Sequence, residues 1–218
     1  MLENARLRVE KGVIRTFHAR RGRVTKNQIF ALENYFKKFE LPEGPWNFQE
    51  LFGNKDVVYE IGCGSGESTI GFAKANPNSI IIAVEVHRPS ISHLVESAHN
   101  ENLTNIRVCY SDAVQVLRDW VSDESLKAIY AFFPDPWPKK RHNKRRLFRA
   151  EIVDLMQRKL KPGGEILAAT DWQEYGKQMV EVLPNSTLTK RPSWRPKTKY
   201  ERKGIEAGRE IMEVSGSK

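Results

Sequence analysis

Residues 57–66 of this 218-residue chain read VVYEIGCGSG, and they indicate the fold class more clearly than any other stretch. The run Val57-Val58-Tyr59 predicts a strand, and three glycines, Gly62, Gly64 and Gly66, follow it directly. Glycines at this position let the backbone turn sharply and approach a ligand closely. The stretch therefore predicts a strand that passes through a tight loop into a helix, with room for a ligand beside the loop.

Beyond this loop, apolar runs alternate with helical patterns. We expect strands at residues 57–59, 79–84, 106–109, 126–133, 165–169 and 210–214, and helices at 25–39, after Gly66, at 90–99, before 120, at 144–160 and before 182. Such alternation predicts an α/β fold, a mostly parallel sheet with helices on both faces. A Pro- and Lys-rich loop is expected after Pro184. Residues 1–24, rich in Arg, are expected to form a flexible basic arm, and residues 25–218 a single domain.

Acidic residues follow the first three predicted strands. The loop has the spacing G-x-G-x-G, with Glu67 where the dinucleotide-binding motif requires a third glycine, which argues against NAD. A carboxylate at Glu60 would attract a cationic ligand such as S-adenosyl-L-methionine, which carries an ammonium and a sulfonium. Glu85 could accept both ribose hydroxyls, and Asp112 could accept the adenine amino group. The three acids together favour S-adenosyl-L-methionine.

A second informative stretch, residues 133–146, reads FPDPWPKKRHNKRR. Asp135 lies between two prolines, which fix a stiff and non-helical turn. Trp137 is suited to gripping a planar base, and the cations that follow are suited to phosphate. Because the turn follows the predicted strand 126–133, it should lie at the edge of the sheet where ligands bind. We therefore expect the reacting base here.

The charge distribution favours a nucleic-acid partner. The net charge is +9, and three segments, 15–26, 139–149 and 190–203, contain 5, 7 and 7 basic residues. If the fold brings them together, they form a phosphate-binding surface. Cys63 and Cys109 have no metal-ligand spacing, so no metal site is expected. Without a predicted leader or membrane span, we expect a cytoplasmic protein that does not bind membranes.

From about Arg15 to Val214 the chain resembles the bacterial tRNA (guanine-N7-)-methyltransferases, and the run 134–146 is the most specific element of the match. The resemblance implies a Rossmann-like class I methyltransferase with a seven-stranded sheet. It also implies methyl transfer from S-adenosyl-L-methionine to N7 of the variable-loop guanine of tRNA, at position 46. No obligatory protein partner is expected, and the choice between monomer and homodimer stays open.

The resemblance also assigns the residues of the site. For the cofactor it implies Glu60, Glu85, Asp112 and Asp135, and the glycine loop adds Gly62, Gly64 and Gly66 as cofactor-binding residues. For the substrate it implies Lys139, Asp171, Thr198, Lys199, Tyr200 and Glu201. For RNA it implies Arg141, His142, Asn143, Lys144, Arg145 and Arg146.

The chemistry of guanine N7 needs no general base, because the atom carries a lone pair and no proton in neutral guanine. Catalysis then consists mostly of positioning and electrostatics. Asp135 is the expected catalytic residue, because its carboxylate could accept the guanine N1–H and amino edge and favour the developing positive charge. His142 lies among cations, so we expect a neutral hydrogen-bonding residue. Asp171 could instead be only a helix N-cap.

Two alternatives stay open. The segment Asp135-Pro136-Trp137 is similar to the Asn/Asp-Pro-Pro-aromatic motif of enzymes that methylate exocyclic amines of nucleic-acid bases. A non-catalytic RNA-binding module with a vestigial nucleoside pocket is the second alternative. Retention of Glu60, Glu85 and Asp112 with an intact glycine loop argues against this second function.

Overall fold

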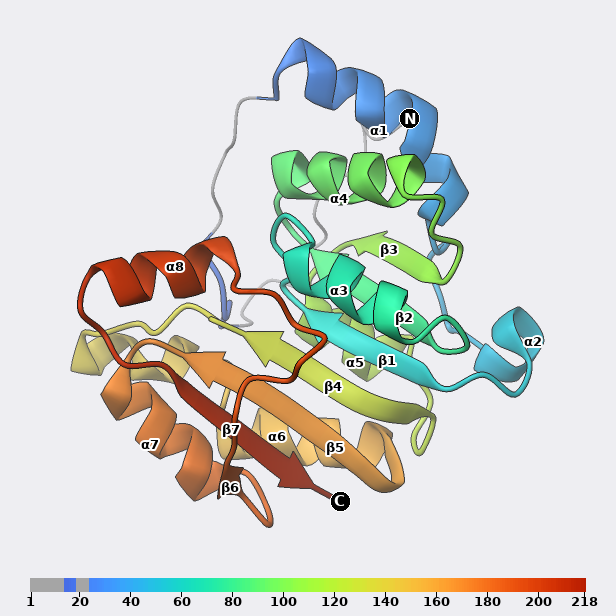
Figure 1. Cartoon of the computed structure of the whole chain (residues 1–218). Helices are drawn as coiled ribbons and strands as arrows, with labels where there is room; N and C mark the ends of the chain where they lie inside the picture. The colour runs from blue at the N-terminus through green and yellow to red at the C-terminus, as the bar shows by residue number, and fades with distance from the viewer. Residues whose placement is uncertain (1–13, 19–23) are drawn as a thin grey trace.

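A seven-stranded sheet in the order β3-β2-β1-β4-β5-β7-β6 runs through the protein (Figure 1). The computed structural model describes residues 14–18 and 24–218. The strands are β1 (Val57–Ile61), β2 (Ile80–Glu85), β3 (Ile106–Tyr110), β4 (Leu126–Phe132), β5 (Leu160–Thr170), β6 (Thr187–Leu188) and β7 (Met212–Ser217). The first five are parallel, and β7 pairs antiparallel with both β5 and β6. The predicted α/β class with a mostly parallel seven-stranded sheet is confirmed.

Helices cover both faces of the sheet. They are α1 (Lys26–Phe39), α2 (Phe48–Phe52), α3 (Glu67–Ala75), α4 (Arg88–Asn100), α5 (Ala113–Asp119), α6 (Ala150–Lys159), α7 (Gln173–Val182) and α8 (Lys199–Glu206). Apolar side chains of α1, α3 and α4 pack in one core, and those of α5, α6 and α7 pack in the other. With both faces covered, every residue of β2 is buried, as expected for a central parallel strand.

Local sequence signals explain where several elements begin. Thr25 and Gln28 form a reciprocal capping box at the start of α1, so the helix start predicted at Thr25 is confirmed. Asp112 caps α5 with its carboxylate. The parallel topology fixes the position of the site, because the loops after β1, β2, β3 and β4 all lie at the carboxyl edge of the sheet.

The structure corrects three predicted elements. The helix predicted at 144–160 begins only at Ala150, because a 3-10 helix over Lys140–Arg145 and an extended segment precede it. The loop predicted after Pro184 contains a short strand, β6, and a helix, α8. The last strand runs from Met212 to Ser217, beyond its predicted end at 214. Within the predicted arm, residues 14–18 contact the body of the protein, and residues 1–13 and 19–23 lie outside the described part.

Candidate functional site

The glycine loop between β1 and α3 is packed at one end and open at the other. Gly62, Gly64 and Gly66 have φ angles of 69°, 55° and 84°, values that residues with a side chain rarely adopt. A Cβ at Gly66 would lie 2.5 Å from Cδ1 of Leu94, so only glycine permits the packing of α3 against α4. A Cβ at Gly62 would meet nothing within 4 Å. The loop therefore offers open space at Gly62.

Glu60 lies beneath this loop, with 2% of its surface exposed. Its carboxylate accepts hydrogen bonds from the hydroxyls of Ser68 and Thr69 in the first turn of α3. Burial raises the pKa of Glu60, and the two hydroxyl hydrogen bonds lower it in part. Glu60, which was predicted to bind the cofactor, thus also has a structural role, because it joins the end of β1 to α3.

Glu85 ends β2 and fastens the glycine loop from the other side. Its Oε2 accepts the backbone N–H of Gly64 at 2.9 Å, and its Oε1 accepts those of Val86 and His87 at 2.7 and 3.0 Å. Burial raises the pKa of Glu85, these hydrogen bonds lower it, and the nearby charge of Asp135 raises it. Oε1 already accepts two donors, and Oε2 can accept one more. Glu85 therefore lies between the glycine loop and the turn that follows β4.

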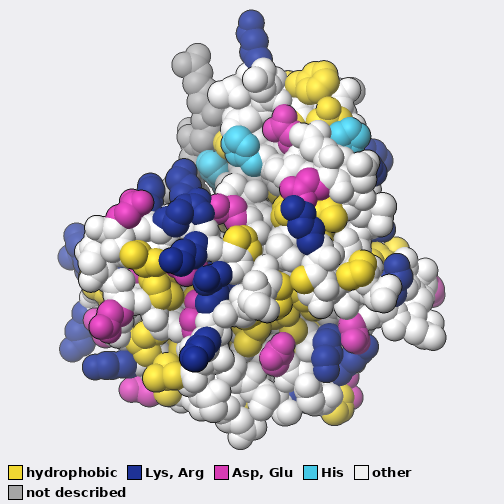
Figure 2. Space-filling model, in the orientation of Figure 1, with side chains coloured by type: hydrophobic (Ala, Val, Ile, Leu, Met, Phe, Trp, Pro, Cys, Tyr) yellow, Lys and Arg dark blue, Asp and Glu magenta, His cyan; other side chains and the backbone are white. Residues whose placement is uncertain are grey.

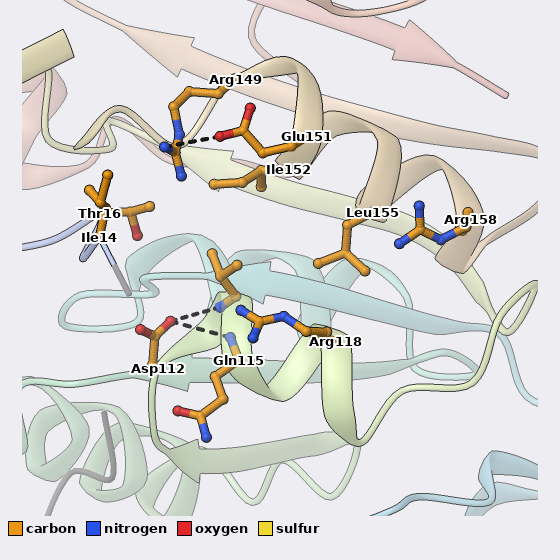
Figure 3. Close-up of a pocket in the computed structure, with 11 residues that line it drawn as sticks. Ile14, Thr16, Asp112, Gln115, Arg118, Arg149, Glu151, Ile152, Leu155 and Arg158 are labelled. Atoms are coloured by element: carbon orange, nitrogen blue, oxygen red, sulfur yellow. Dashed lines mark hydrogen bonds and ion pairs between the residues drawn. The ribbon is translucent and has the colours of Figure 1, made fainter. Parts of the chain in front are cut away.

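Asp112 follows β3 and lies beside a cavity of about 280 Å³ between α5 and α6 (Figure 3). Its Oδ1 accepts the backbone N–H groups of Val114 and Gln115 at 2.9 and 3.4 Å. Burial raises the pKa of Asp112, and these hydrogen bonds partly offset the effect. Ile14 and Thr16 line the same cavity, so the described part of the N-terminal segment passes next to Asp112.

The turn after β4 carries two unusual backbone angles. Phe133 and Trp137 have φ values of 56° and 44° without being glycine. Such conformations cost about 1–3 kcal/mol each and concentrate at functional sites. Asp135 lies between them, half-buried, and its Oδ2 accepts the backbone N–H of His18 at 2.9 Å. The rigid turn predicted from the two prolines is therefore present, with backbone strain on both sides of the acid.

Arg146 supports this turn from below, which corrects its assignment to RNA contact. Only 1% of its surface is exposed. Its guanidinium donates to the carbonyl of Pro136 at 2.9 Å, to Gln178 at 2.6 Å and to Glu174 at 3.0 Å. It also lies 5.0 Å from the centre of the Tyr175 ring. A guanidinium buried in this way has no free face for a phosphate, so Arg146 joins the turn to α7.

The rest of the cationic segment is accessible. Lys139, Lys140, Arg141, Lys144 and Arg145 are exposed, whereas His142 and Asn143 are half-buried. Partial burial of the ring and then the charge of Arg141 lower the pKa of His142, which agrees with a neutral imidazole. Figure 2 shows a second gathering of Lys and Arg side chains over the region of α8.

Helix α8 lies over the glycine loop, where the sequence predicted only a Lys-rich loop. The backbone N–H of Lys199 donates to Oε2 of Glu67 at 2.6 Å, and Arg202 pairs with Oε1 of Glu67 at 2.7 Å. A Cβ on Gly64 would lie 3.9 Å from Cε2 of Tyr200. Tyr200 itself is 50% exposed. The helix thus places Tyr200 beside Gly64 and leaves the side chains of Lys199 and Tyr200 exposed.

The other two residues of the predicted substrate motif lie inside. Thr198 caps α8 through its hydroxyl, and Glu201 is 4% exposed. Glu201 pairs with Arg195 at 3.0 Å and with Arg191 at 3.3 Å. The structure therefore gives Thr198 and Glu201 structural partners, and it separates them from the exposed pair Lys199 and Tyr200.

Arg195 is a central residue whose role the sequence pattern does not indicate. It is fully buried, pairs with both Glu201 and Glu213, and lies 4.6 Å from the centre of the Phe132 ring at the end of β4. Burial lowers the pKa of Arg195 and raises that of Glu213 to about 7. In the sequence Arg195 was one of many cations in a basic segment, and only its neighbour Trp194 hinted at burial.

Asp171 follows β5 and is not a helix cap. The N-cap of α7 is Trp172, which makes no side-chain capping hydrogen bond. The carboxylate of Asp171 instead pairs with Arg209 at 2.6 Å, and its side chain touches the position of Gly204 in α8. The carboxyl end of β5 is thereby joined to α8, on the same edge of the sheet as Asp135.

The fold and the loop after β1 together define a class. The chain superposes on the 16S rRNA methyltransferase KamB with a TM-score of 0.58 at 16% identity, covering 78% of this chain and 91% of that one. TrmN from Thermus thermophilus gives a TM-score of 0.53 at 17% identity, covering 78% and 47%. At such low identity these likenesses show the fold alone. The fold is that of the Rossmann-like methyltransferases.

Sequence comparison narrows the class to a family. The putative methyltransferase family model matches residues 54–214. The tRNA (guanine-N(7)-)-methyltransferase of Yersinia enterocolitica is 41% identical over 214 residues, covering 92% of this chain and 90% of the relative. That of Francisella tularensis subsp. novicida is 38% identical over 213 residues, covering 92% and 93%. The chain belongs to the tRNA (guanine-N(7)-)-methyltransferase family, whose members are enzymes that use S-adenosyl-L-methionine.

The described chain also has no helix that is long and apolar enough to cross a membrane.

Proposed function

We propose that this protein transfers a methyl group from S-adenosyl-L-methionine to N7 of the variable-loop guanine of tRNA, at position 46. The observation that carries the proposal is the placement of Asp135. It lies in a strained turn at the end of β4, close enough to Glu85 to raise its pKa, and directly before the exposed cations that begin at Lys139. The substrate is proposed from the names of the relatives, which are about 40% identical to this chain.

The residues at the carboxyl edge fit S-adenosyl-L-methionine. Open space beside Gly62 and the nearby carboxylate of Glu60 suit the cationic amino-acid end of the cofactor. Glu85 and Asp112, at the ends of β2 and β3, suit the ribose hydroxyls and the adenine amino group. When bound, the cofactor supplies an electrophilic methyl group. The protein residues then only need to bind the two reactants and align them.

Asp135 is the proposed catalytic residue. Its carboxylate would accept hydrogen bonds from the guanine N1–H and amino group, which orients N7 toward the methyl donor. As guanine becomes cationic, a fixed negative charge at this edge stabilises the transition state more than the ground state. The strained and supported turn keeps this charge in place before the substrate arrives. No residue has to remove a proton from N7.

Lys139, the first residues of α8 and the carboxyl end of β5 form the proposed substrate side of the site. Lys139 is exposed at the end of the turn, and Lys199 and Tyr200 are exposed on α8. For Asp171, Thr198 and Glu201 we propose a role that includes holding α8 in position, because each has a partner within the protein. Arg141, His142, Asn143, Lys144 and Arg145 form the proposed tRNA-binding segment, which would attract phosphates largely without regard to sequence.

Identification of the methylated nucleoside tests this proposal. The full chain is incubated with labelled S-adenosyl-L-methionine and unmodified tRNA, and the tRNA is digested to nucleosides. We expect label in 7-methylguanosine, and none in a tRNA that carries adenosine in place of the variable-loop guanine. Label in an exocyclic N-methyl nucleoside would replace the proposal by the exocyclic-amine function. No label at all, with tRNA bound, would favour a non-catalytic RNA-binding module.

A further inference from the structure

His18 occupies both groups with which the turn after β4 would hold a base. Its imidazole stacks on the indole of Trp137, with ring centroids 3.9 Å apart and an interplanar angle of 27°. Its backbone N–H donates to Oδ2 of Asp135 at 2.9 Å. A planar heteroaromatic ring and an N–H donor, presented together, are the two features that guanine would bring to the same pair of residues.

Trp137 is held ready for such a ring by the rest of the turn. Its backbone has a φ of 44°, His142 contacts it edge to face at 5.8 Å, and the guanidinium of Arg145 lies 4.9 Å from its centre. Its Nε1 donates to the carbonyl of Thr16 at 3.2 Å. Although the indole sits in a turn at the sheet edge, only 4% of its surface is exposed, and the segment 14–18 supplies part of that cover.

We propose that Trp137 is the platform on which the target guanine stacks, and that His18 takes the place of this guanine in the protein without tRNA. The inference rests on the proposed function and adds to it a residue that binds the base. A ring stacked at 3.9 Å leaves no room for a second ring on the same face. The guanine must therefore displace His18, and tRNA binding is opposed by the energy needed to break this internal stack.

The contacts of the neighbouring residues make the position of His18 specific. Ile14 and Thr16 line the cavity beside Asp112, the proposed adenine acid (Figure 3), and the charge of Arg15 offsets part of the rise that burial causes in the pKa of Asp112. At the end of the same segment, His18 contacts the proposed guanine acid, Asp135. It competes with the base at Asp135 and Trp137 and covers the edge of the site while no tRNA is bound.

The test uses the full chain, with guanosine 5′-monophosphate as the probe for the base and tRNA as the substrate. His18→Ala removes the ring and keeps the backbone donor, whereas His18→Phe keeps a ring that can stack. His93→Ala, at an exposed histidine of α4, is the matched control. We expect His18→Ala to bind the probe about threefold to tenfold more tightly and to lower the KM for tRNA by a similar factor, the scale of one aromatic pair. His18→Phe and His93→Ala should resemble wild type.

A second variant separates competition from a general effect on folding. In a Trp137→Leu background, whose folding is checked by circular dichroism, His18→Ala should change probe affinity little, because the shared platform is gone. Unchanged affinity for probe and tRNA in His18→Ala alone would overturn the inference. A higher KM for tRNA would also overturn it, since His18 would then help to bind the substrate. Formation of 7-methylguanosine by wild type is scored separately, so failure of the proposed function remains distinguishable.

Discussion

Glu67 accepts a hydrogen bond from the backbone N–H of Lys199 at 2.6 Å, although the two residues are separated by 132 positions in the chain. The first turn after the glycine loop thereby fixes the start of α8. The residue that breaks the dinucleotide motif is the one that docks this helix. This hydrogen bond therefore links the glycine loop, which is proposed to bind the cofactor, to α8, which carries proposed substrate residues.

Loss of this connection should affect tRNA more than the fold. We expect Glu67→Ala to raise the KM for tRNA severalfold and to lower the free energy of unfolding by about 1 kcal/mol, because exposed ion pairs contribute little. Glu101→Ala, which removes an exposed pair with Lys74 at the other end of α3, is the control. Steady-state kinetics and amide hydrogen exchange in α8 measure the two effects. Unchanged exchange in α8 would show that Glu67 does not hold the helix.

Arg145 and Arg146 are neighbours with opposite expected effects. Arg146→Ala should lower the free energy of unfolding by about 2–3 kcal/mol, because hydrogen bonds from a charged, buried donor are removed. Arg145→Ala should leave stability within about 0.5 kcal/mol of wild type. It should instead weaken tRNA binding and reduce the slope of log affinity against log salt by about 0.7–0.9 for each phosphate that is no longer neutralised. Denaturation and binding titrations at several salt concentrations distinguish them; equal stability of the two variants would refute the structural role of Arg146.

Glu85 should matter for the cofactor. We expect Glu85→Gln to weaken S-adenosyl-L-methionine binding by about tenfold to a hundredfold, the value of hydrogen bonds to a charged group. Part of the loss would come from the hydrogen bond to Gly64, which shapes the loop. The affinity for tRNA should change little. Calorimetric titration measures the cofactor affinity, with Glu33→Gln on the exposed face of α1 as control. A folded variant with wild-type cofactor affinity would remove Glu85 from the site.

Glu213 should make stability depend on pH. Its pKa is raised from 4.5 to about 7 by burial, so the folded protein binds a proton there more tightly than the unfolded chain. Stability contributed by this group is therefore largest below pH 4.5, falls as the pH rises toward 7, and is constant above it. Melting temperatures measured between pH 5 and 8 should fall less in Glu213→Gln than in wild type. An equal fall in both would show that the ion pair with Arg195 keeps Glu213 charged.

The strands and the acids at their ends were predictable because they depend on local pattern. β2 is a continuous apolar run since both its faces are covered, and Glu85 is the residue at which that run ends. The helix α1 was predictable because Thr25 and Gln28 give a complete start signal. Residues at the ends of parallel strands meet at one edge, so their proximity followed from the fold class.

Tertiary contacts decided the features that the sequence did not reveal. Arg146 stands in a run of cations, and only the approach of α7 shows that it is buried. Helix α8 is short and Lys-rich, and its position depends on the distant Glu67. His18 lies in a segment without periodicity, where no local signal indicates a stack on Trp137.

Asp135→Asn is the sharpest test of the catalytic role proposed for Asp135, because it keeps the size of the side chain and the turn while it removes the charge. Single-turnover methylation of tRNA is measured with saturating S-adenosyl-L-methionine over a series of pH values. We predict a rate lower by about 10²-fold or more, the scale of removing one preorganised electrostatic interaction. The affinity for tRNA should fall least, and no titrating base should appear near neutral pH. A rate close to wild type would refute the catalytic role of Asp135 and would leave it as a residue of the turn alone.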